Sequence, residues 1–242
     1  MTAHDAPVHY FDRVASTQDI AHRLASEGAP SGTAVVAVEQ TAGRGSRGRE
    51  WSSGRGGLWV SVLWRPAEAA NPETLSLRAS LSLAAALEAA GCPALGIKWP
   101  NDLMLGNRKA GGILCEARWS GDTLSWVVAG AGVNVTNDIP ESLAHAACTV
   151  QPGRGELRVN DLLLPAIAAL RAAGARRGPL APDELAEFAR RDWLRGRMLT
   201  APINGCAQGI AADGALLVRR PDGTLAVARA GTVAAIATPL QP

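Results

Sequence analysis

One short segment of the chain concentrates groups that bind anions. Residues Gln40–Trp51 read QTAGRGSRGREW, and we call the part from Gly43 to Trp51 the Gly–Arg loop. Glycines let a backbone turn tightly and bring its N–H groups to an anion, while the arginines offer planar donor forks for phosphates and carboxylates. The closing tryptophan could stack on a base. The pattern predicts an anion-binding loop, although a solvated surface loop or a nucleic-acid-binding tract would also fit this segment alone.

A second segment, Lys98–Leu103, reads KWPNDL and follows an apolar stretch. It places a cation, an aromatic ring and an amide–carboxylate pair on a turn at the end of a predicted strand. The proline favours an extended conformation in the residue before it, which holds Lys98 in a defined relation to Asn101 and Asp102. An Asn-Asp pair also ends strands for purely local reasons, so a capped turn with a solvated lysine is the alternative.

Three further segments carry polar groups at element ends. Arg108–Glu116 reads RKAGGILCE and places Lys109 at the mouth of an apolar strand. In Gly130–Val135, GAGVNV, two glycines interrupt an apolar strand, which usually marks a close approach by a ligand or another chain. Ser16-Thr17-Gln18 opens a predicted helix, where free N–H groups suit a polar ligand group or simply form a helix cap.

Composition limits the class of protein. Of the 242 residues, 47% are hydrophobic and 19% charged, which is typical of a globular protein. The chain has no apolar run of about 18 residues and no signal peptide, so we expect a cytoplasmic protein with no membrane partner. The four cysteines and four histidines lack ligand spacing, which argues against a zinc site and against Cys–His catalysis.

Charge adds one observation. A net charge of +2 is too balanced to indicate a nucleic-acid-binding protein. Among 24 basic residues, the only lysines are Lys98 and Lys109. Arginine-rich composition alone could explain this, or lysine could be kept where a compact ammonium is needed.

Periodicity predicts an α+β fold with a mixed β-sheet and helices over residues 1–195, followed by a small all-β domain over residues 196–242. The predicted strands of the first part are Val8–Phe11, Thr33–Val38, Leu58–Trp64, Leu95–Lys98, Gly112–Arg118 and Ser125–Val135. The predicted helices are Thr17–Glu27, Asn71–Gly91, 160–176 and Pro182–Leu194. In the second part, Asp-Gly turns separate short strands at Met198–Ala201, Gly205–Ile210, Ala215–Arg219, Thr224–Ala228 and Gly231–Ala237.

In this order, the five segments resemble the catalytic domain of biotin–protein ligases. The motifs GRGxxGRxW, KWPND(L), RKxxGILxE and GxGxN carry the resemblance, which runs from Val8 to Val135. It implies a class II synthetase-like domain with an SH3-like C-terminal β-barrel. It also implies an ATP-dependent, AMP-forming ligase that converts biotin to biotinyl-5′-AMP with Mg²⁺. Such an enzyme then transfers the biotinyl group to a lysine of the biotin carboxyl carrier protein of acetyl-CoA carboxylase or a related carboxylase.

The resemblance also assigns residues. Those expected to bind biotin are Ser16, Thr17, Gln18, Gln40, Arg44, Gly45, Ser46 and Lys109. Those expected to bind ATP or the adenylate are Arg47, Arg49, Trp51, Lys98, Asn101, Asp102 and Asn134. Lys109 and Arg44 are the expected catalytic residues. Asp102 is the candidate for a metal ligand.

Two positions depart from the family pattern. Gln18 stands where asparagine is typical, which keeps the amide but lengthens its reach. Ser46 stands where many members carry an additional loop arginine. One cation fewer should weaken the hold on the adenylate phosphate, so we hypothesise that biotinyl-AMP is released more readily than from arginine-bearing relatives.

Three rival functions remain: a lipoate or octanoyl ligase or transferase of the same fold, a nucleic-acid-binding module, and a ligase-like biotin sensor without activity. Some family members carry a helix-turn-helix and act as repressors. Too few residues precede the first predicted strand for such a domain, so we expect neither specific DNA binding nor repression. A monomer and a homodimer are both compatible with the sequence.

Overall fold

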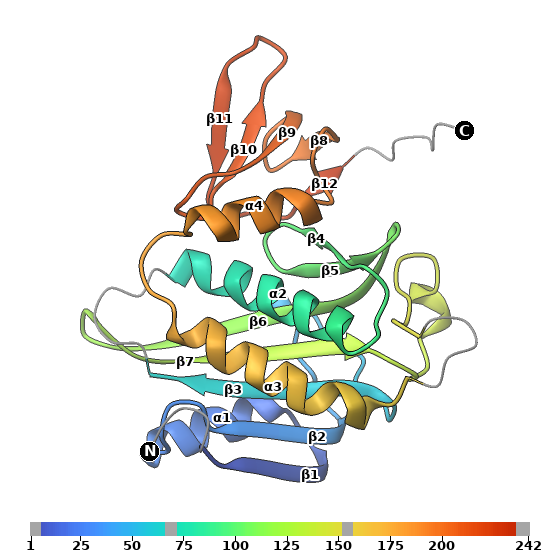
Figure 1. Ribbon diagram of the computed structural model, residues 1–242, viewed down its shortest axis with the longest axis vertical. Coiled ribbons are helices and arrows are strands. Elements are labelled where there is room, and N and C mark those ends of the chain that lie inside the picture. The colour runs from blue at the N-terminus through green and yellow to red at the C-terminus, as the bar shows by residue number, and fades with distance from the viewer. Residues whose placement is uncertain (1–5, 66–71, 152–156, 236–242) are drawn as a thin grey trace.

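A seven-stranded mixed sheet forms the centre of the computed structural model, which describes residues 6–65, 72–151 and 157–235 (Figure 1). The strand order is β1-β2-β3-β7-β6-β5-β4. β1 and β2 pair in parallel and the other neighbours are antiparallel. The strands are β1 (Val8–Val14), β2 (Ala34–Gln40), β3 (Gly57–Trp64), β4 (Gly96–Lys98), β5 (Asp102–Leu105), β6 (Arg108–Ser120) and β7 (Thr123–Asn134). The predicted α+β fold with a mixed sheet is thus confirmed.

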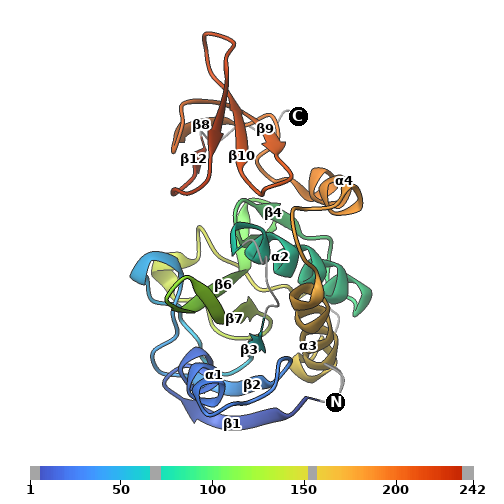
Figure 2. The same cartoon turned by 90° about the vertical axis from the view of Figure 1, so that its left-hand side faces the viewer.

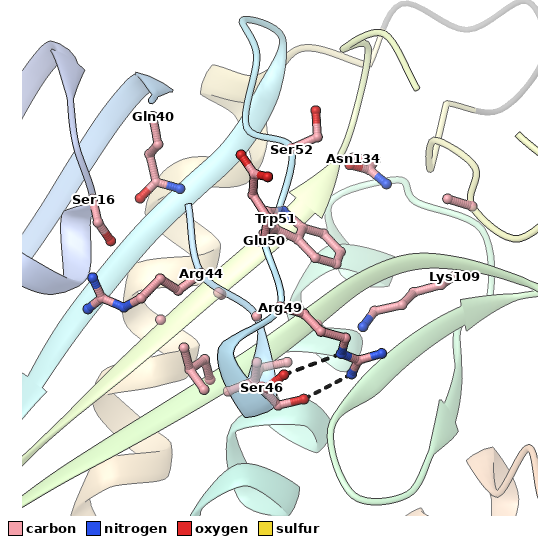
Figure 3. Close-up of a pocket in the computed structure, with 18 of the residues that line it drawn as sticks. Ser16, Gln40, Arg44, Ser46, Arg49, Glu50, Trp51, Ser52, Lys109 and Asn134 are labelled. Atoms are coloured by element: carbon pink, nitrogen blue, oxygen red, sulfur yellow. Dashed lines mark hydrogen bonds between the residues drawn. The ribbon is translucent and has the colours of Figure 1, made fainter. Parts of the chain in front are cut away.

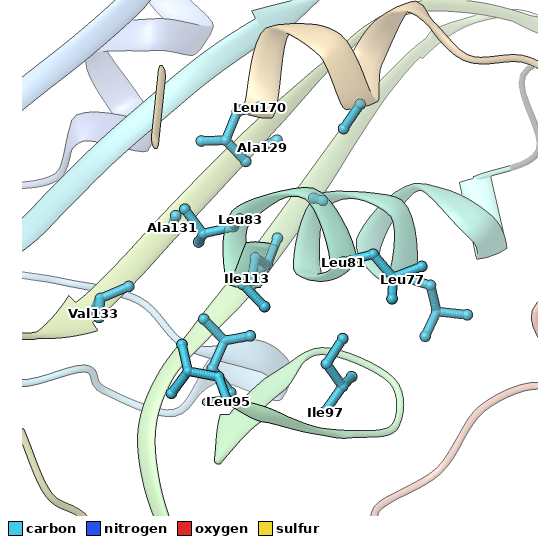
Figure 4. Packing of buried hydrophobic residues seen from close by; sticks show 14 of the residues in the cluster. Leu77, Leu81, Leu83, Leu95, Ile97, Ile113, Ala129, Ala131, Val133 and Leu170 are labelled. Atoms are coloured by element: carbon cyan, nitrogen blue, oxygen red, sulfur yellow. The ribbon is translucent and has the colours of Figure 1, made fainter. Parts of the chain in front are cut away.

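Helices cover both faces of this sheet (Figures 1 and 2). The alternation of side chains along β3 separates the two layers: Leu58, Val60 and Val62 join one apolar cluster, and Leu63 joins another. α2 (Pro72–Ala89) and α3 (Val159–Ala175) pack on the first face, where leucines of α2 lie over β6 and β7 (Figure 4).

The other face of the sheet carries α1 (Thr17–Ser26). The small side chains of Ala21 and Ala25 pack against Val35, Leu63 and Val128 of the strands. Ser16 is the N-cap of this helix, since its hydroxyl accepts a hydrogen bond from the backbone N–H of Gln18 at 3.3 Å. The predicted cap is thereby confirmed, and it fixes where the first turn of α1 points.

A second sheet of antiparallel strands stands at one end of the molecule (Figure 2). Its order is β11-β10-β9-β8-β12. The strands are β8 (Met198–Ala201), β9 (Gly205–Ile210), β10 (Leu216–Arg219), β11 (Leu225–Ala228) and β12 (Ala234–Ala235), reached through α4 (Pro182–Arg191). These strands confirm the predicted C-terminal β module, while its closure as an SH3-like barrel stays a prediction.

The turn between β4 and β5 connects the two sheets. Trp99, 3% exposed, donates a hydrogen bond from Nε1 to the carbonyl of Gly214 at 2.8 Å. One apolar cluster runs from Ile97 and Trp99 through Leu194 to Leu216. The domain boundary predicted after residue 195 stays a prediction, and apolar contacts cross it.

The predicted turn after the strand that ends at Lys98 is confirmed, but the strand that follows it was not predicted: Lys98 and Asp102 pair across a hairpin, so Asp102 begins β5. The structure also corrects the end of one predicted helix. α4 ends at Arg191 instead of Leu194, because Trp193 leaves the helix and donates its backbone N–H to Ile97 of β4. The predicted helix start at Asn71 and the last residues of the predicted strand Gly231–Ala237 lie outside the described residues. No helix in the described part of the chain is long and apolar enough to cross a membrane.

Candidate active site

A cavity of about 320 Å³, here called the main cavity, opens beside the N-terminus of α1 (Figure 3). Its walls come from α1, the Gly–Arg loop, β6, β7 and the segment after β7. The volume falls within the range of small-molecule sites. The sequence-predicted residues that line it are Ser16, Thr17, Gln18, Gln40, Arg44, Gly45, Ser46, Arg49, Trp51, Asn101, Lys109 and Asn134.

One end of the main cavity is a preorganised set of hydroxyls and amides. Gln40 Oε1 accepts hydrogen bonds from the Thr17 backbone N–H at 2.8 Å and from its hydroxyl at 3.0 Å. The Thr17 hydroxyl lies 2.8 Å from that of Ser61, and Gln40 Nε2 donates to Ser53 at 2.9 Å. Sequence reasoning missed Ser61, although a lone serine within the apolar strand GLWVSVLW was the available signal.

Gln18 is also part of this polar end, and its side chain packs closely against Gly130. Its Nε2 donates to the carbonyl of Leu114 at 3.1 Å. Its Oε1 is buried and has no hydrogen-bond partner among the described residues. A Cβ on Gly130 would lie 2.9 Å from Gln18 Cδ, so the close approach that the strand glycine predicts is made by a side chain of this chain. A buried acceptor without a donor is costly, and it suits a ligand N–H group.

The Gly–Arg loop is an ordered, irregular hairpin. Trp51 donates its backbone N–H to Gly43 at 2.9 Å, and Gly45 donates to Arg49 at 2.7 Å. A Cβ on Gly43 would lie 2.4 Å from the carbonyl oxygen of Trp51, so only glycine fits there. At the tip, Arg47 has a φ of 62°, in the left-handed region that non-glycine residues rarely occupy. These contacts argue against an open, solvated loop.

The loop arginines point in three directions. Arg44 pairs with Asp19 at 2.7 Å and with Glu116 at 3.1 Å, on the side of α1. Arg49 bonds back to Ser46 within the loop. Arg47 donates to the hydroxyl of Thr232, close to the C-terminal sheet. Of the three loop arginines, Arg44 and Arg49 line the main cavity and Arg47 does not, which the sequence could not show.

Lys109 lies at the centre of the site. Its Nζ is 2.5 Å from Asp102 Oδ1 and 4.9 Å from the centroid of the Trp51 ring. The ring of Trp51 stands over Gly132, where an added Cβ would lie 2.7 Å from Trp51 Nε1. The second strand glycine thus makes room for the tryptophan. An ammonium, a carboxylate and an aromatic ring are thereby brought together from β6, β5 and the Gly–Arg loop.

A second cavity of about 250 Å³ adjoins the first and is also lined by Thr232 and Val233, just before β12. It contains the three site residues absent from the main cavity, Arg47, Lys98 and Asp102. Ser46, Arg49, Asn101 and Leu114 line both cavities. Burial lowers the pKa of Lys98, whose Nζ lies 5.5 Å from the Trp193 ring centroid. Three cations around one small cavity suit a polyanion such as a chain of phosphates.

Two predicted site residues hold the walls in place through their amides. Asn134 donates from Nδ2 to the carbonyl of Cys148 at 3.2 Å and accepts from Asn137 at 3.2 Å. Asn101 donates to the carbonyl of Ile113 at 2.5 Å. The segment held by Asn134, residues 137–147, lines the main cavity mostly with apolar side chains, beside those of Asn137 and Asp138. Sequence reasoning missed this wall, because no periodic pattern marks it.

Together, the fold and the two cavities define a ligand-binding α+β domain that has hydrogen-bonding groups at one end of the site and cations at the other. Residues 10–134 match the model of the biotin/lipoate A/B protein ligase family. A biotin–[acetyl-CoA-carboxylase] ligase of Paracoccus denitrificans is 38% identical over 214 residues, covering 80% of this chain and 87% of the relative. The chain belongs to the biotin/lipoate A/B protein ligase family.

A further relative and a solved structure are also similar to this chain. The bifunctional ligase/repressor BirA of Bacillus spizizenii is 40% identical over 152 residues, which are 61% of this chain; the chain spans about half of that protein, 47% of its length. Among solved structures, the biotin protein ligase of Aquifex aeolicus in complex with biotin and ATP has a TM-score of 0.80 at 27% identity. That match covers 96% of this chain and 99% of the other.

Proposed function

We propose that the protein is an ATP-dependent, AMP-forming biotin–protein ligase. It activates biotin as biotinyl-5′-AMP and transfers the biotinyl group to a lysine of the biotin carboxyl carrier domain of a biotin-dependent carboxylase. The observation that carries the proposal is the place of Lys109, between the polar end of the main cavity and the cation-lined second cavity. The family and the Aquifex similarity support the same assignment.

The polar end of the main cavity favours biotin over lipoate. A ureido ring offers two N–H donors and a carbonyl acceptor, whereas a dithiolane ring offers neither. The acceptor of Gln18 has no protein donor among the described residues, and the hydroxyls of Thr17 and Ser61 lie close by. A site whose buried polar groups need a partner discriminates strongly against a ligand that lacks one.

The first step needs charge neutralisation and no general base. The biotin carboxylate is already ionised at neutral pH, and one of its oxygens attacks the α-phosphorus of ATP while pyrophosphate leaves. Lys109 lies where it can contact both the carboxylate and the α-phosphate, and Arg47, Arg49 and Lys98 surround the space for the departing phosphates. Positioned cations at the developing charge are the main source of such catalysis.

Asp102 is the residue that would hold Mg²⁺. The described residues contain no group of three metal-ligating side chains, so a cage made by protein alone does not form among them. Mg²⁺ is commonly held by one or two carboxylates together with substrate phosphates, and a single carboxylate beside the second cavity fits that pattern. When bound, the ion would neutralise part of the phosphate charge. Asp102 meanwhile holds the ammonium of Lys109.

In the second step, the carrier lysine attacks the carbonyl carbon of the mixed anhydride, and AMP leaves. The Gly–Arg loop lies beside the main cavity, where it can keep water from the anhydride before the carrier arrives. The carrier domain is therefore the proposed protein partner. The cytoplasmic location, the monomer or homodimer and the absence of specific DNA binding stay predictions.

Two assays test this function. The first is pyrophosphate exchange into ATP in the presence of biotin or of lipoate, where we expect exchange with biotin alone. The second follows isotope-labelled biotin onto a purified carrier domain by mass spectrometry, with a carrier whose acceptor lysine is replaced by arginine as the control. Exchange with lipoate alone would reassign the protein to the lipoate branch of the family.

A further inference from the structure

Trp193 lies against the lysine of the second cavity. The Nζ of Lys98 is 5.5 Å from the centroid of the indole ring. A cation within about 6 Å of an aromatic ring is attracted by the negative face of that ring, and tryptophan attracts it most strongly. Trp193 is not among the residues that line the two cavities, so its effect on a ligand there would be indirect.

Three contacts fix the place of the Trp193 ring. The backbone N–H of Trp193 donates to the carbonyl of Ile97 at 3.0 Å, one residue before Lys98. The indole Nε1 donates to the carbonyl of Gly106 at 2.8 Å, in the turn that follows β5. The guanidinium of Arg197 lies over the ring, with its Cζ 3.8 Å from the ring centroid. The ring is thus held against the β4–β5 hairpin that carries Lys98.

The charges around Lys98 are mostly of its own sign. Asp102 faces Lys98 across the hairpin, but its carboxylate pairs with Lys109, with Oδ1 and Nζ 2.5 Å apart. Burial lowers the pKa of Lys98, and against the opposing effect of Asp102 three cations lower it further: Lys109, Arg49 and Arg197. The face of the Trp193 ring therefore offers the Lys98 ammonium an attraction in surroundings that otherwise repel it.

We propose that Trp193 is a positioning residue: its ring holds the ammonium of Lys98 at the second cavity, where the phosphates of ATP would bind. The orientation of Lys98 is then set by the segment between α4 and the C-terminal sheet, and not by the β4–β5 hairpin alone. A cation that is already in place loses less freedom when the phosphates bind. As regards the phosphate ligand, the inference rests on the proposed function.

The decisive comparison is Trp193→Leu against Trp193→Phe. Both variants lose the indole hydrogen bond to Gly106, so any loosening of that turn is common to them. Phenylalanine keeps an aromatic face for the Lys98 ammonium, whereas leucine does not. A difference between the two variants therefore reports on the contact between the ring and the cation.

The composition of the chain allows a direct measurement by NMR, because Lys98 and Lys109 are its only lysines. Labelling with ¹³C-lysine gives Cε–Hε signals from these two residues alone, and Lys98→Arg assigns them by removing those of Lys98. Protons above an aromatic ring resonate upfield of their position in an unfolded chain. We expect the Lys98 signals to be shifted upfield in wild type and in Trp193→Phe, and the shift to be lost in Trp193→Leu.

Two NMR results would overturn the inference. One is the same position of the Lys98 signals in wild type and in Trp193→Leu. The other is an equal displacement of these signals in Trp193→Leu and Trp193→Phe, which would mean that the indole hydrogen bond to Gly106, and not the face of the ring, decides where Lys98 lies.

A second readout uses the enzyme reaction. We expect the KM for ATP to rise about fivefold in Trp193→Leu, with kcat and the KM for biotin within about twofold, and to stay near wild type in Trp193→Phe. In a Lys98→Met background, which lacks the cation, Trp193→Leu should raise the KM for ATP no further. An equal rise in both backgrounds would mean that Trp193 acts independently of Lys98 and would reject the positioning role. If wild type forms no adenylate from biotin and ATP, the proposed function fails, and the lysine spectrum alone decides whether Trp193 holds Lys98.

Discussion

The hydroxyl of Ser46 accepts a hydrogen bond from Arg49, with Nη2 and Oγ 3.0 Å apart, and the Ser46 carbonyl lies 3.3 Å from Arg49 Nε (Figure 3). Ser46, which stands where many family members carry an additional loop arginine, therefore holds the neighbouring cation. Arg49 lines both cavities, so this contact fixes one guanidinium at the border between them. The residue at position 46 affects the loop in two ways, through the charge it lacks and through the arginine it holds.

Ser46→Arg is expected to slow the release of biotinyl-AMP by severalfold, because an added cation beside the phosphate outweighs the loss of one exposed hydrogen bond from Arg49 to a serine hydroxyl. The measurement is the dissociation rate of labelled adenylate after rapid dilution into unlabelled substrate. Ser46→Ala is the matched control, since it removes the hydroxyl without adding charge and should release the adenylate at least as fast as wild type. Equal rates for wild type and Ser46→Arg would reject the hypothesis.

Lys109→Ala should abolish adenylation and leave the fold intact. The side chain is at the surface of the main cavity, where its ammonium pairs with Asp102, and truncation leaves no buried hole. Losing a positioned charge at the reacting phosphate should slow pyrophosphate exchange by about a hundredfold or more. A Tm within a few degrees of wild type would show that the protein is folded. Normal exchange by this variant would contradict the assigned role.

Gly130→Ala and Gly132→Ala should separate the two substrates. A methyl group at 130 displaces the Gln18 amide, whereas one at 132 displaces the Trp51 ring. We expect the first to raise KM for biotin by about tenfold, and the second to raise KM for ATP more than KM for biotin. Adding Gln18→Asn to Gly130→Ala shortens the displaced side chain and should recover part of the biotin affinity. If both glycine variants raise the same KM, for biotin or for ATP, then Gln18 and Trp51 do not contact different substrates.

The stability of the protein should depend on the titration of Asp192. Burial raises the pKa of this carboxyl from its ordinary value of 3.8 to about 6, and its Oδ2 has no hydrogen-bond partner among the described residues. Because the folded state has the higher pKa, the contribution of the protonated carboxyl to stability is complete below pH 3.8 and is lost as the pH rises through 6.

Asp192→Asn removes this titration. Urea unfolding between pH 4 and 8 should show the free energy of unfolding of wild type falling relative to that of Asp192→Asn up to about pH 7, and then running parallel to it. A difference that does not change with pH would mean that the carboxyl titrates normally.

Local patterns predicted most of the elements, because periodicity, glycine placement and the Ser16 cap are properties of neighbouring residues. The residues of the site were assigned by the family resemblance. The residues Ser16–Gln18, Gln40 and Lys109 all reach the main cavity as expected. What failed depended on partners distant in the chain. The directions of the loop arginines depend on acceptors in α1, in β6 and in the segment just before β12.

The hydrogen bond from Trp99 to Gly214 has a consequence for protein engineering. The turn that presents Lys98 and Asn101 to the site rests on the C-terminal sheet, and Arg47 at the loop tip reaches Thr232 beside the same sheet. A chimaera in which only the last strands come from a relative would change the contacts that support both segments. We therefore expect an exchange of the C-terminal sheet to preserve the site when the β4–β5 hairpin and the Gly–Arg loop of the same relative are exchanged with it.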